Sequence, residues 1–219
     1  MSYFTANAND INDHDHHGDA PHEHHYDPEG DKMGMWLFLF TELLLFGIFF
    51  IGFAVYLNMY PEDFSNCSKK LNPILGGINT LVLLISSFTM ALAIQQLQKG
   101  NKMASQILSF LTLICAGVFC LIKSFEWTHK FDIGLFLNSE HLATLPHGEQ
   151  IFYGLYFVMT GTHAIHVIIG AILIITTMVF VHFDKVHAGR ITLIENAGLF
   201  WHLVDLIWIF LFPLYYLIG

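Results

Sequence analysis

The chain has 219 residues, of which 54% are hydrophobic and 12% are charged, and 21 are phenylalanine. Soluble proteins average about 25% charged residues, so the polar groups here are too few to cover the surface of a water-soluble domain. The net charge of −9, with 9 Lys and Arg residues in all, excludes the clustered basic surface that nucleic-acid binding requires. The 3 cysteines are too few for a disulfide framework.

Residues 1–31 differ in composition from the rest of the chain: they carry many acidic residues and histidines and no Lys or Arg. Such a segment buries little apolar area, and we predict a disordered or extended N-terminal tail. It lacks the basic and apolar regions of a cleavable signal peptide, so we expect the first membrane helix to direct insertion. Imidazole and carboxylate groups suit Zn or Cu, and a solvated acidic tail is the competing interpretation. The candidate ligands are His14, His16, His17, His22, His24 and His25.

Five apolar runs follow within residues 32–219, which we expect to form one domain. They cover residues 33–59, 73–97, 103–125, 150–183 and 191–218. Each run reaches the ~20 residues that a helix needs to cross a ~30 Å hydrocarbon core, and the fourth must tilt or project beyond it. We therefore predict an all-α integral membrane bundle of five transmembrane helices. In the fourth run, Gly154 and Gly161 lie one heptad apart and predict a close approach of two helices.

The distribution of Lys and Arg between the loops favours a cytoplasmic N-terminus and a C-terminus on the other side. The two short loops on the N-terminal side, residues 99–102 and 184–190, are both net basic. An odd number of spans gives no support for a transporter built of inverted halves. An ion or proton transporter in which Glu42 and Asp205 titrate during turnover is still an alternative.

The ionisable and amide side chains inside the apolar runs are the candidate functional residues, because an unpaired charge in lipid costs at least a few kcal/mol. Glu42 lies ~13 Å deep in the first run, where it is either a proton or lipid-headgroup partner or a structural acid between helices. In the last run, Glu195, His202 and Asp205 share one helical face. We predict that such residues make buried contacts between helices. The full set is Glu42, Asn79, Glu126, His163, His166, Glu195, His202 and Asp205.

Three of these histidines also allow a cofactor interpretation. His163 or His166 facing His202 could ligate a b-type haem. No single run shows the spaced histidine pair of bis-haem bundles, and each of the three histidines has an acidic or small residue beside it. An interhelical hydrogen-bond network is the interpretation that we favour, and we expect no metal site within the bundle.

Five fragments of the sequence resemble, in order, the motifs of one family. Residues 34–47, GMWLFLFTELLLFG, resemble its G-x-W-x-F-x-x-S-E-x-x-x-F segment, and Asn79-Thr80 matches the end of its L-N-T. Glu126 corresponds to the acid of its E-W or E-Y pair. Residues 157–167, FVMTGTHAIHV, are similar to its F-x-x-T-G-x-H-x-x-H-V, and residues 201–208, WHLVDLIW, to its W-H-F-V-D-x-x-W. The family is subunit III of the haem–copper oxidases, and the resemblance runs from about residue 32 to residue 219.

The resemblance implies an accessory subunit without a cofactor of its own, since haem and copper belong to subunits I and II in this family. Subunit III packs beside subunit I, binds phospholipid, and supports proton uptake and the durability of the catalytic subunit. We therefore expect a subunit of a proton-translocating oxidase that reduces O₂ to water in the bacterial cytoplasmic membrane. Its expected partners are subunits I and II, membrane phospholipid and a larger respiratory supercomplex.

Two departures from the family pattern bear on this reading. The commoner form has seven helices, and this chain would lack the first two. In the family, lipid lies in a cleft between those two helices and the rest of the bundle. The histidine-rich tail is no part of the shared motifs and inherits no role from them. Two alternatives stay open: a subunit III-like partner of a nitric oxide reductase, and a haem-binding membrane redox subunit.

Overall fold

The computed structural model describes residues 28–132, 134–136, 139, 142, 144–184, 186 and 191–218. The six histidines of the N-terminal tail lie outside these residues, and the tail therefore stays a prediction.

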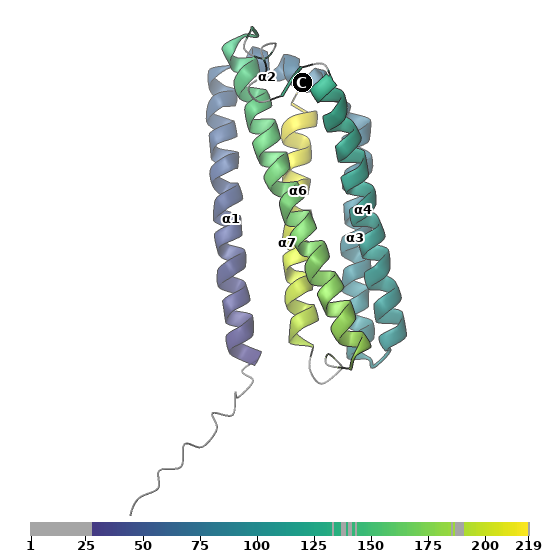
Figure 1. The fold of residues 1–219 in the computed structure, drawn as a ribbon. Helices are drawn as coiled ribbons and strands as arrows, with labels where there is room; N and C mark the ends of the chain where they lie inside the picture. Colours follow the sequence, from purple (N-terminus) through teal and green to yellow (C-terminus); the bar gives the residue numbers. More distant parts are fainter. Residues whose placement is uncertain are drawn as a thin grey trace, which may run out of the picture.

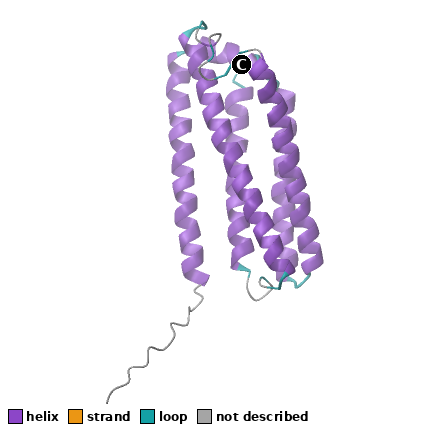
Figure 2. Ribbon diagram, viewed as in Figure 1, coloured by secondary structure: helices purple, strands orange, loops and turns teal. Residues whose placement is uncertain are grey.

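The described residues form one bundle of long helices with no strand among them (Figures 1 and 2). The helices are α1 (Pro28–Met59), α2 (Pro61–Lys69), α3 (Pro73–Gln98), α4 (Lys102–Asp132), α6 (His147–His182) and α7 (Thr192–Tyr216). All except α2 are long and apolar enough to cross a membrane, which makes 5 candidate spans in this part of the chain. The predicted all-α fold with five spans is confirmed, and the chain is a multi-pass membrane protein.

Proline and asparagine residues mark where several helices begin. α1 begins at Pro28, ahead of the expected residue 33. α3 begins with Pro73, and the side chain of Asn72 before it accepts hydrogen bonds from the backbone N–H groups of Ile74 (3.0 Å) and Leu75. Proline suits the first helical position because that residue's N–H has no partner within the helix. Asparagine is among the preferred residues just before it, where its oxygen meets the free N–H groups.

α4 is longer than its apolar run predicts. The run ends at Phe125, but the helix continues to Asp132. Lys130 in this extension is buried, and Glu126 is enclosed by other helices. Apolarity alone therefore placed the end of α4 too early in the sequence, because polar residues of the extension also point into the protein.

α2 lies between the first two apolar runs, where the sequence predicted no helix. It lies across the end of the bundle at which α1 ends and α6 begins (Figure 1). Phe64 is fully buried, with its ring 5.2 Å from that of Phe53 and 5.3 Å from that of Phe152. Burial and the nearby charge of Glu149 raise the pKa of the Cys67 thiol to about 12, so that it stays protonated at neutral pH.

α7 lies inside the bundle, between α1, α3 and α6 (Figure 1). The ring of Trp201 is fully buried against Gly170 of α6, where an added Cβ would lie only 2.7 Å from the indole. An added Cβ at Gly198 would meet the side chain of Ile94 on α3 even more closely. No side chain comes within 4 Å of the corresponding position at Gly154. At Gly161, the other glycine of the predicted pair, an added Cβ would lie 3.4 Å from the ring of Trp127 on α4. The tightest of these contacts therefore occur at Gly170 and Gly198, and Gly154 makes none.

α1 is the least enclosed of the long helices. Its outer face is exposed along its length, at residues such as Leu37, Leu44 and Ile51. It contacts α7 through a stacked pair of rings, Phe38 and Phe200, whose centroids are 5.8 Å apart. This exposed face is available to lipid or to another chain.

We predict that Gly170→Ala destabilises the protein and that Gly154→Ala does not. An alanine in a helix interior ordinarily stabilises by about 0.5–1 kcal/mol relative to glycine. At Gly170 the methyl group must displace the buried indole of Trp201, and overpacking of this kind costs about 1–3 kcal/mol. Thermal unfolding of the purified protein in detergent, followed by tryptophan fluorescence, measures the difference. Equal melting temperatures of the two variants would contradict the packing at Gly170.

Candidate functional site

The carboxylate of Glu42 on α1 meets His166 on α6. Its Oε2 lies 2.7 Å from Nε2 of the imidazole, and both side chains are mostly buried. The other ring nitrogen, Nδ1, lies 2.7 Å from the backbone carbonyl oxygen of Thr162. The fully buried ring of Phe46 lies steeply inclined to the imidazole, with ring centroids 5.3 Å apart. Two residues from different motifs of the sequence therefore bond to each other inside the bundle.

The proton positions of this pair follow from its geometry. A carbonyl oxygen only accepts, so Nδ1–H donates to Thr162. One proton then lies between Nε2 and Glu42, either on an imidazolium that faces a carboxylate or on a carboxylic acid that faces a neutral imidazole. Either arrangement places one hydrogen bond between Nε2 and Oε2.

A second set of polar contacts joins α7 to α3. Nδ1 of His202 lies 2.6 Å from the Ser87 hydroxyl. The Ser86 hydroxyl lies 3.3 Å from Oδ2 of Asp205 and accepts a bond from the indole N–H of Trp201 at 3.1 Å. These contacts fall on successive turns, so the polar face predicted for the last run looks at the polar stripes of α3.

Asn79 and His163 are fully buried, yet neither side chain has a hydrogen-bond partner among the described residues. The imidazole of His163 instead lies between two aromatic rings, 5.6 Å from the centroid of Phe119 and 5.2 Å from that of Trp208. Oδ1 of Asp205 is also buried without a partner in this part of the chain. A polar contact for Asn79 and His163 stays a prediction.

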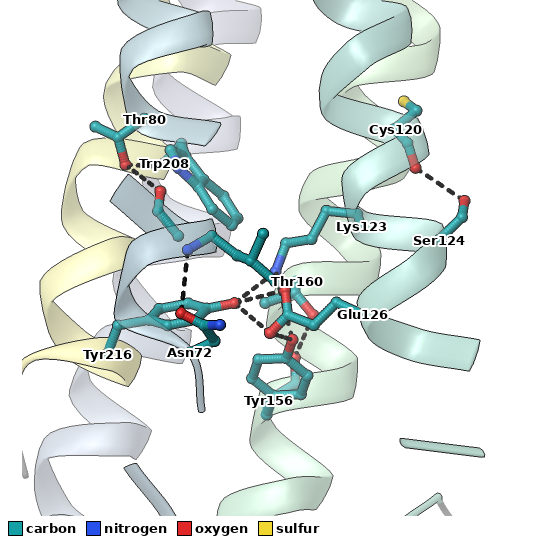
Figure 3. A network of polar contacts seen from close by, with 12 residues as sticks. Asn72, Thr80, Cys120, Lys123, Ser124, Glu126, Tyr156, Thr160, Trp208 and Tyr216 are labelled. Carbon is teal, nitrogen blue, oxygen red and sulfur yellow. Dashed lines mark hydrogen bonds and ion pairs between the residues drawn. The ribbon is translucent and has the colours of Figure 1, made fainter. Parts of the chain in front are cut away.

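Glu126 is at the centre of a cluster near the end of the bundle where α2 lies (Figure 3). Nζ of Lys123 lies 3.0 Å from its Oε2, and the two side chains are only 6% and 8% exposed. Tyr156 on α6 and Tyr216 on α7 donate their hydroxyls to Oε1 at 2.9 and 2.6 Å. The ammonium group also lies 4.7 Å from the ring centroid of Trp208. This cluster connects α4, α6 and α7.

The predicted site residues included Glu126 but not the three residues that surround it, Lys123, Tyr156 and Tyr216. A lysine in an apolar run and tyrosines facing a bundle both require polar partners, and that requirement is the signal that could have found them. Lys130, also missed, is buried one turn beyond Glu126, with its Nζ 5.2 Å from the ring centroid of Tyr156.

Glu195 lies away from these clusters, at the start of α7. Its carboxylate pairs with Lys32 at the start of α1 (3.0 Å) and accepts a bond from Gln98 at the end of α3 (3.3 Å). At the opposite end of the bundle, Lys70 pairs with Glu149 at 2.9 Å. Ion pairs therefore join helix ends on both sides of the membrane.

The predicted residues do not converge on one centre: Glu42 with His166, the α3–α7 contacts, Glu126 and Glu195 are four separate places. Both ring nitrogens of His166 are bonded to protein oxygens, so a ligand role would require the loss of one of these bonds. No three His, Cys, Asp or Glu side chains of the described ranges gather as metal ligands would.

The fold and these contacts define a multi-pass helical membrane protein whose interior polar groups pair mainly with one another. Residues 9–219 match the family described as cytochrome c oxidase subunit III, and the chain belongs to this family. It is 29% identical over 215 residues to the quinol oxidase subunit 3 of Bacillus spizizenii, covering 94% of this chain and 98% of that protein.

Two further relatives widen the comparison. The cytochrome c oxidase subunit 3 of Synechocystis is 29% identical over 219 residues, covering 98% of this chain and 86% of that protein. The heme-copper oxidase subunit I+III of Aeropyrum pernix is 30% identical over 194 residues, which are 85% of this chain but 22% of that protein. The family is therefore a component of multi-subunit oxidases.

We predict that Glu126→Gln destabilises the protein more than the double change Lys123→Met with Glu126→Gln. Removing one partner of a buried ion pair costs about 3–5 kcal/mol, because the other charge is left buried and unpaired. The double variant removes both charges of the pair. Thermal unfolding in detergent measures both, and Ser124→Ala serves as the control. That exposed hydroxyl bonds only to the Cys120 carbonyl of its own helix. A double variant that is no more stable than Glu126→Gln would contradict the ion pair.

We predict that Glu42→Gln is tolerated better than Glu42→Leu. A glutamine amide still donates to Nε2 of a neutral His166, whereas leucine leaves that buried nitrogen without a partner. An unsatisfied buried polar atom costs about 1–3 kcal/mol. The melting temperature should therefore fall in the order wild type, Glu42→Gln, Glu42→Leu. Two variants of equal stability would show that the Glu42–His166 contact does not stabilise the folded protein.

Proposed function

We propose that the chain is the accessory, cofactor-free subunit III of a proton-translocating haem–copper terminal oxidase that reduces O₂ to water. The observation that carries this proposal is the bond between Glu42 and His166. Each residue comes from a motif shared with the family, and each satisfies the other, so that neither is left to hold a metal or haem. The polar interior thus supports a subunit that assists catalysis rather than one that performs it.

The main partner in this proposal is subunit I, with subunit II as a second. The relative from Aeropyrum pernix supports the pairing with subunit I, because its name joins subunits I and III. This chain matches 22% of that protein's length. The exposed apolar side chains of α1, α3 and α4 offer the faces that a membrane partner or phospholipid would cover. A larger supercomplex of respiratory enzymes is a further expected partner.

We propose a role in proton uptake for the Glu42–His166 pair, which joins an acid to a base through one hydrogen-bonded proton. Its place on α1, the least enclosed long helix, puts that proton near the lipid-facing side of the bundle. We assign the pair to a supporting role, as a site that holds a proton beside the catalytic subunit.

The proposed location is the bacterial cytoplasmic membrane, with the N-terminus in the cytoplasm and the C-terminus in the periplasm. In this orientation the pairs Lys32–Glu195 and Lys102–Asp184 lie at the cytoplasmic ends of their helices. α2 and the Lys70–Glu149 pair then lie on the periplasmic side.

The test is purification of the complex through a tag on this chain. We expect haem-containing subunits I and II to co-purify, and the chain expressed alone to be colourless. A complex prepared without the chain should keep its haem and its initial rate of O₂ reduction, and lose activity in fewer turnovers. A Soret band from the isolated chain would overturn the cofactor-free assignment. Co-purification of a nitric oxide reductase in place of the oxidase would assign the chain to the alternative complex.

A further inference from the structure

Two buried lysines and one buried carboxylate lie close together at the end of the bundle where α4 ends. Lys123 and Lys130 are 5% and 6% exposed, and the side chain of Glu126 is 8% exposed. With their usual charges these three groups sum to one positive charge. Because an unpaired charge away from water costs at least a few kcal/mol, the cluster requires a second negative charge.

The carboxylate of Glu126 is fully occupied by other groups (Figure 3). Nζ of Lys123 lies 3.0 Å from Oε2, and the hydroxyl of Tyr156 donates to Oε1 at 2.9 Å. The hydroxyl of Tyr216 lies 2.6 Å from Oε1 and 2.9 Å from Oε2. These four contacts match the about four lone-pair sites of a carboxylate. Glu126 therefore neutralises Lys123 and has no site left for Lys130.

The ammonium group of Lys130 contacts aromatic rings instead of an acid. Its Nζ lies 5.2 Å from the ring centroid of Tyr156 and 5.8 Å from that of Tyr153. Aromatic rings attract a cation, but they supply no negative charge. Among the described residues, none forms an ion pair or a hydrogen bond with this ammonium group. Lys130 is thus a buried cation without a counter-charge in this part of the chain.

A second hydrogen-bond donor beside Lys130 also lacks a partner. The hydroxyl of Tyr153 is fully buried and makes no hydrogen bond to the residues that the structure describes. Cys67 of α2 lies close to both groups, but its sulfur is only a weak acceptor. One strong donor and one cation therefore lie together without a strong acceptor, and this combination suits an anion.

The position of Lys130 gives an ion access from water. It is the third residue from the end of α4, and the two residues that follow it, Phe131 and Asp132, are exposed. An ion can thus enter along the end of the helix without crossing hydrocarbon. Lys70 and Glu149 at the same end of the bundle pair with each other at 2.9 Å, so they leave the charge of Lys130 unbalanced.

We propose that Lys130 and the hydroxyl of Tyr153 bind one small monovalent anion, of the class of chloride, between α2, α4 and α6. The anion accepts from the ammonium group and from the phenol, and it brings the sum of the buried charges from plus one to zero. A divalent oxyanion would reverse the sign of this sum instead of cancelling it, and it is larger. The site is independent of the proposed role in an oxidase, and so is its test.

The test compares melting temperatures of the purified full-length chain in detergent at constant ionic strength. Sodium gluconate is replaced stepwise by sodium chloride or sodium bromide, since gluconate has the same charge but is too large for the site. A ligand that binds only the folded protein lowers the unfolding constant by the factor 1 + [L]/Kd. We therefore expect the unfolding constant to fall about tenfold for each tenfold rise in halide above Kd.

Two variants locate the effect. Lys130→Met removes the charge and should abolish the response to halide. Lys69→Met is its matched control, because Lys69 is an exposed lysine at the end of α2 and should leave the response unchanged. Tyr153→Phe should change sign with the salt. In gluconate it removes a buried hydroxyl without a strong partner and should not lower the melting temperature, whereas in chloride it removes a donor to the anion and should lower it.

Four outcomes would overturn the proposal. Equal melting temperatures of the wild type in gluconate and in halide would mean that no anion binds. A halide response that persists in Lys130→Met would place the anion elsewhere. Equal effects of Tyr153→Phe in both salts would mean that Tyr153 serves only packing. A halide response that appears only in Glu140→Gln, a change outside the described residues, would mean that a carboxylate of the chain balances Lys130.

Discussion

Lipid offers no partner to a polar side chain, and this constraint governs how the bundle is assembled. Glu42, Glu126 and Asp205 all lie on membrane helices, and each meets a group on a different helix. The cost of an unpaired charge in the membrane is at least a few kcal/mol, so these contacts fix which helix faces which. α7 illustrates the result: Asp205 turns toward α3, while Tyr216 turns toward the end of α4. The apolar surface outside these contacts is free to meet lipid or other chains.

The bundle combines closely packed and loosely packed parts. α7 approaches α6 at Gly170 and α3 at Gly198, where a larger residue would displace Trp201 or Ile94. α1, in contrast, is joined to the bundle by a polar contact in its middle, an ion pair at its start and aromatic contacts along its length. Space remains between α1 and α7 as a consequence. Close packing is concentrated around α7, and α1 is among the helices with an exposed apolar face.

The sequence predicted the spans because length and apolarity suffice to identify a membrane helix. It identified Glu42 and Asp205 as residues that must be paired, for the same reason. It did not reveal the partners: Glu42 and His166 are separated by 124 residues, and only the packing of α1 on α6 brings them together. The end of α4 and the existence of α2 were missed because both contain polar residues. Whether such residues face water or protein depends on neighbours that one segment does not disclose.

The glycines show the same limit. Spacing singled out Gly154 and Gly161, of which only Gly161 would meet another side chain, that of Trp127 at 3.4 Å. A closer contact occurs at Gly170, because the large ring of Trp201 lies opposite it. Periodicity tells which residues share a face, but the shape of the opposing surface decides which small residue is needed.

The separation of Glu42 from His166 has a consequence for biosynthesis. α1 is synthesised first, and its carboxyl group enters the membrane 124 residues before its partner exists. At about 5–20 residues per second, the ribosome needs about 6–25 s to reach the histidine. During this interval the nascent helix carries a lone acid in the lipid, where the neutral, protonated form is the less costly one. The emergence of α6 therefore gives Glu42 its partner, and α1 completes its contacts only when the fifth span, α7, follows.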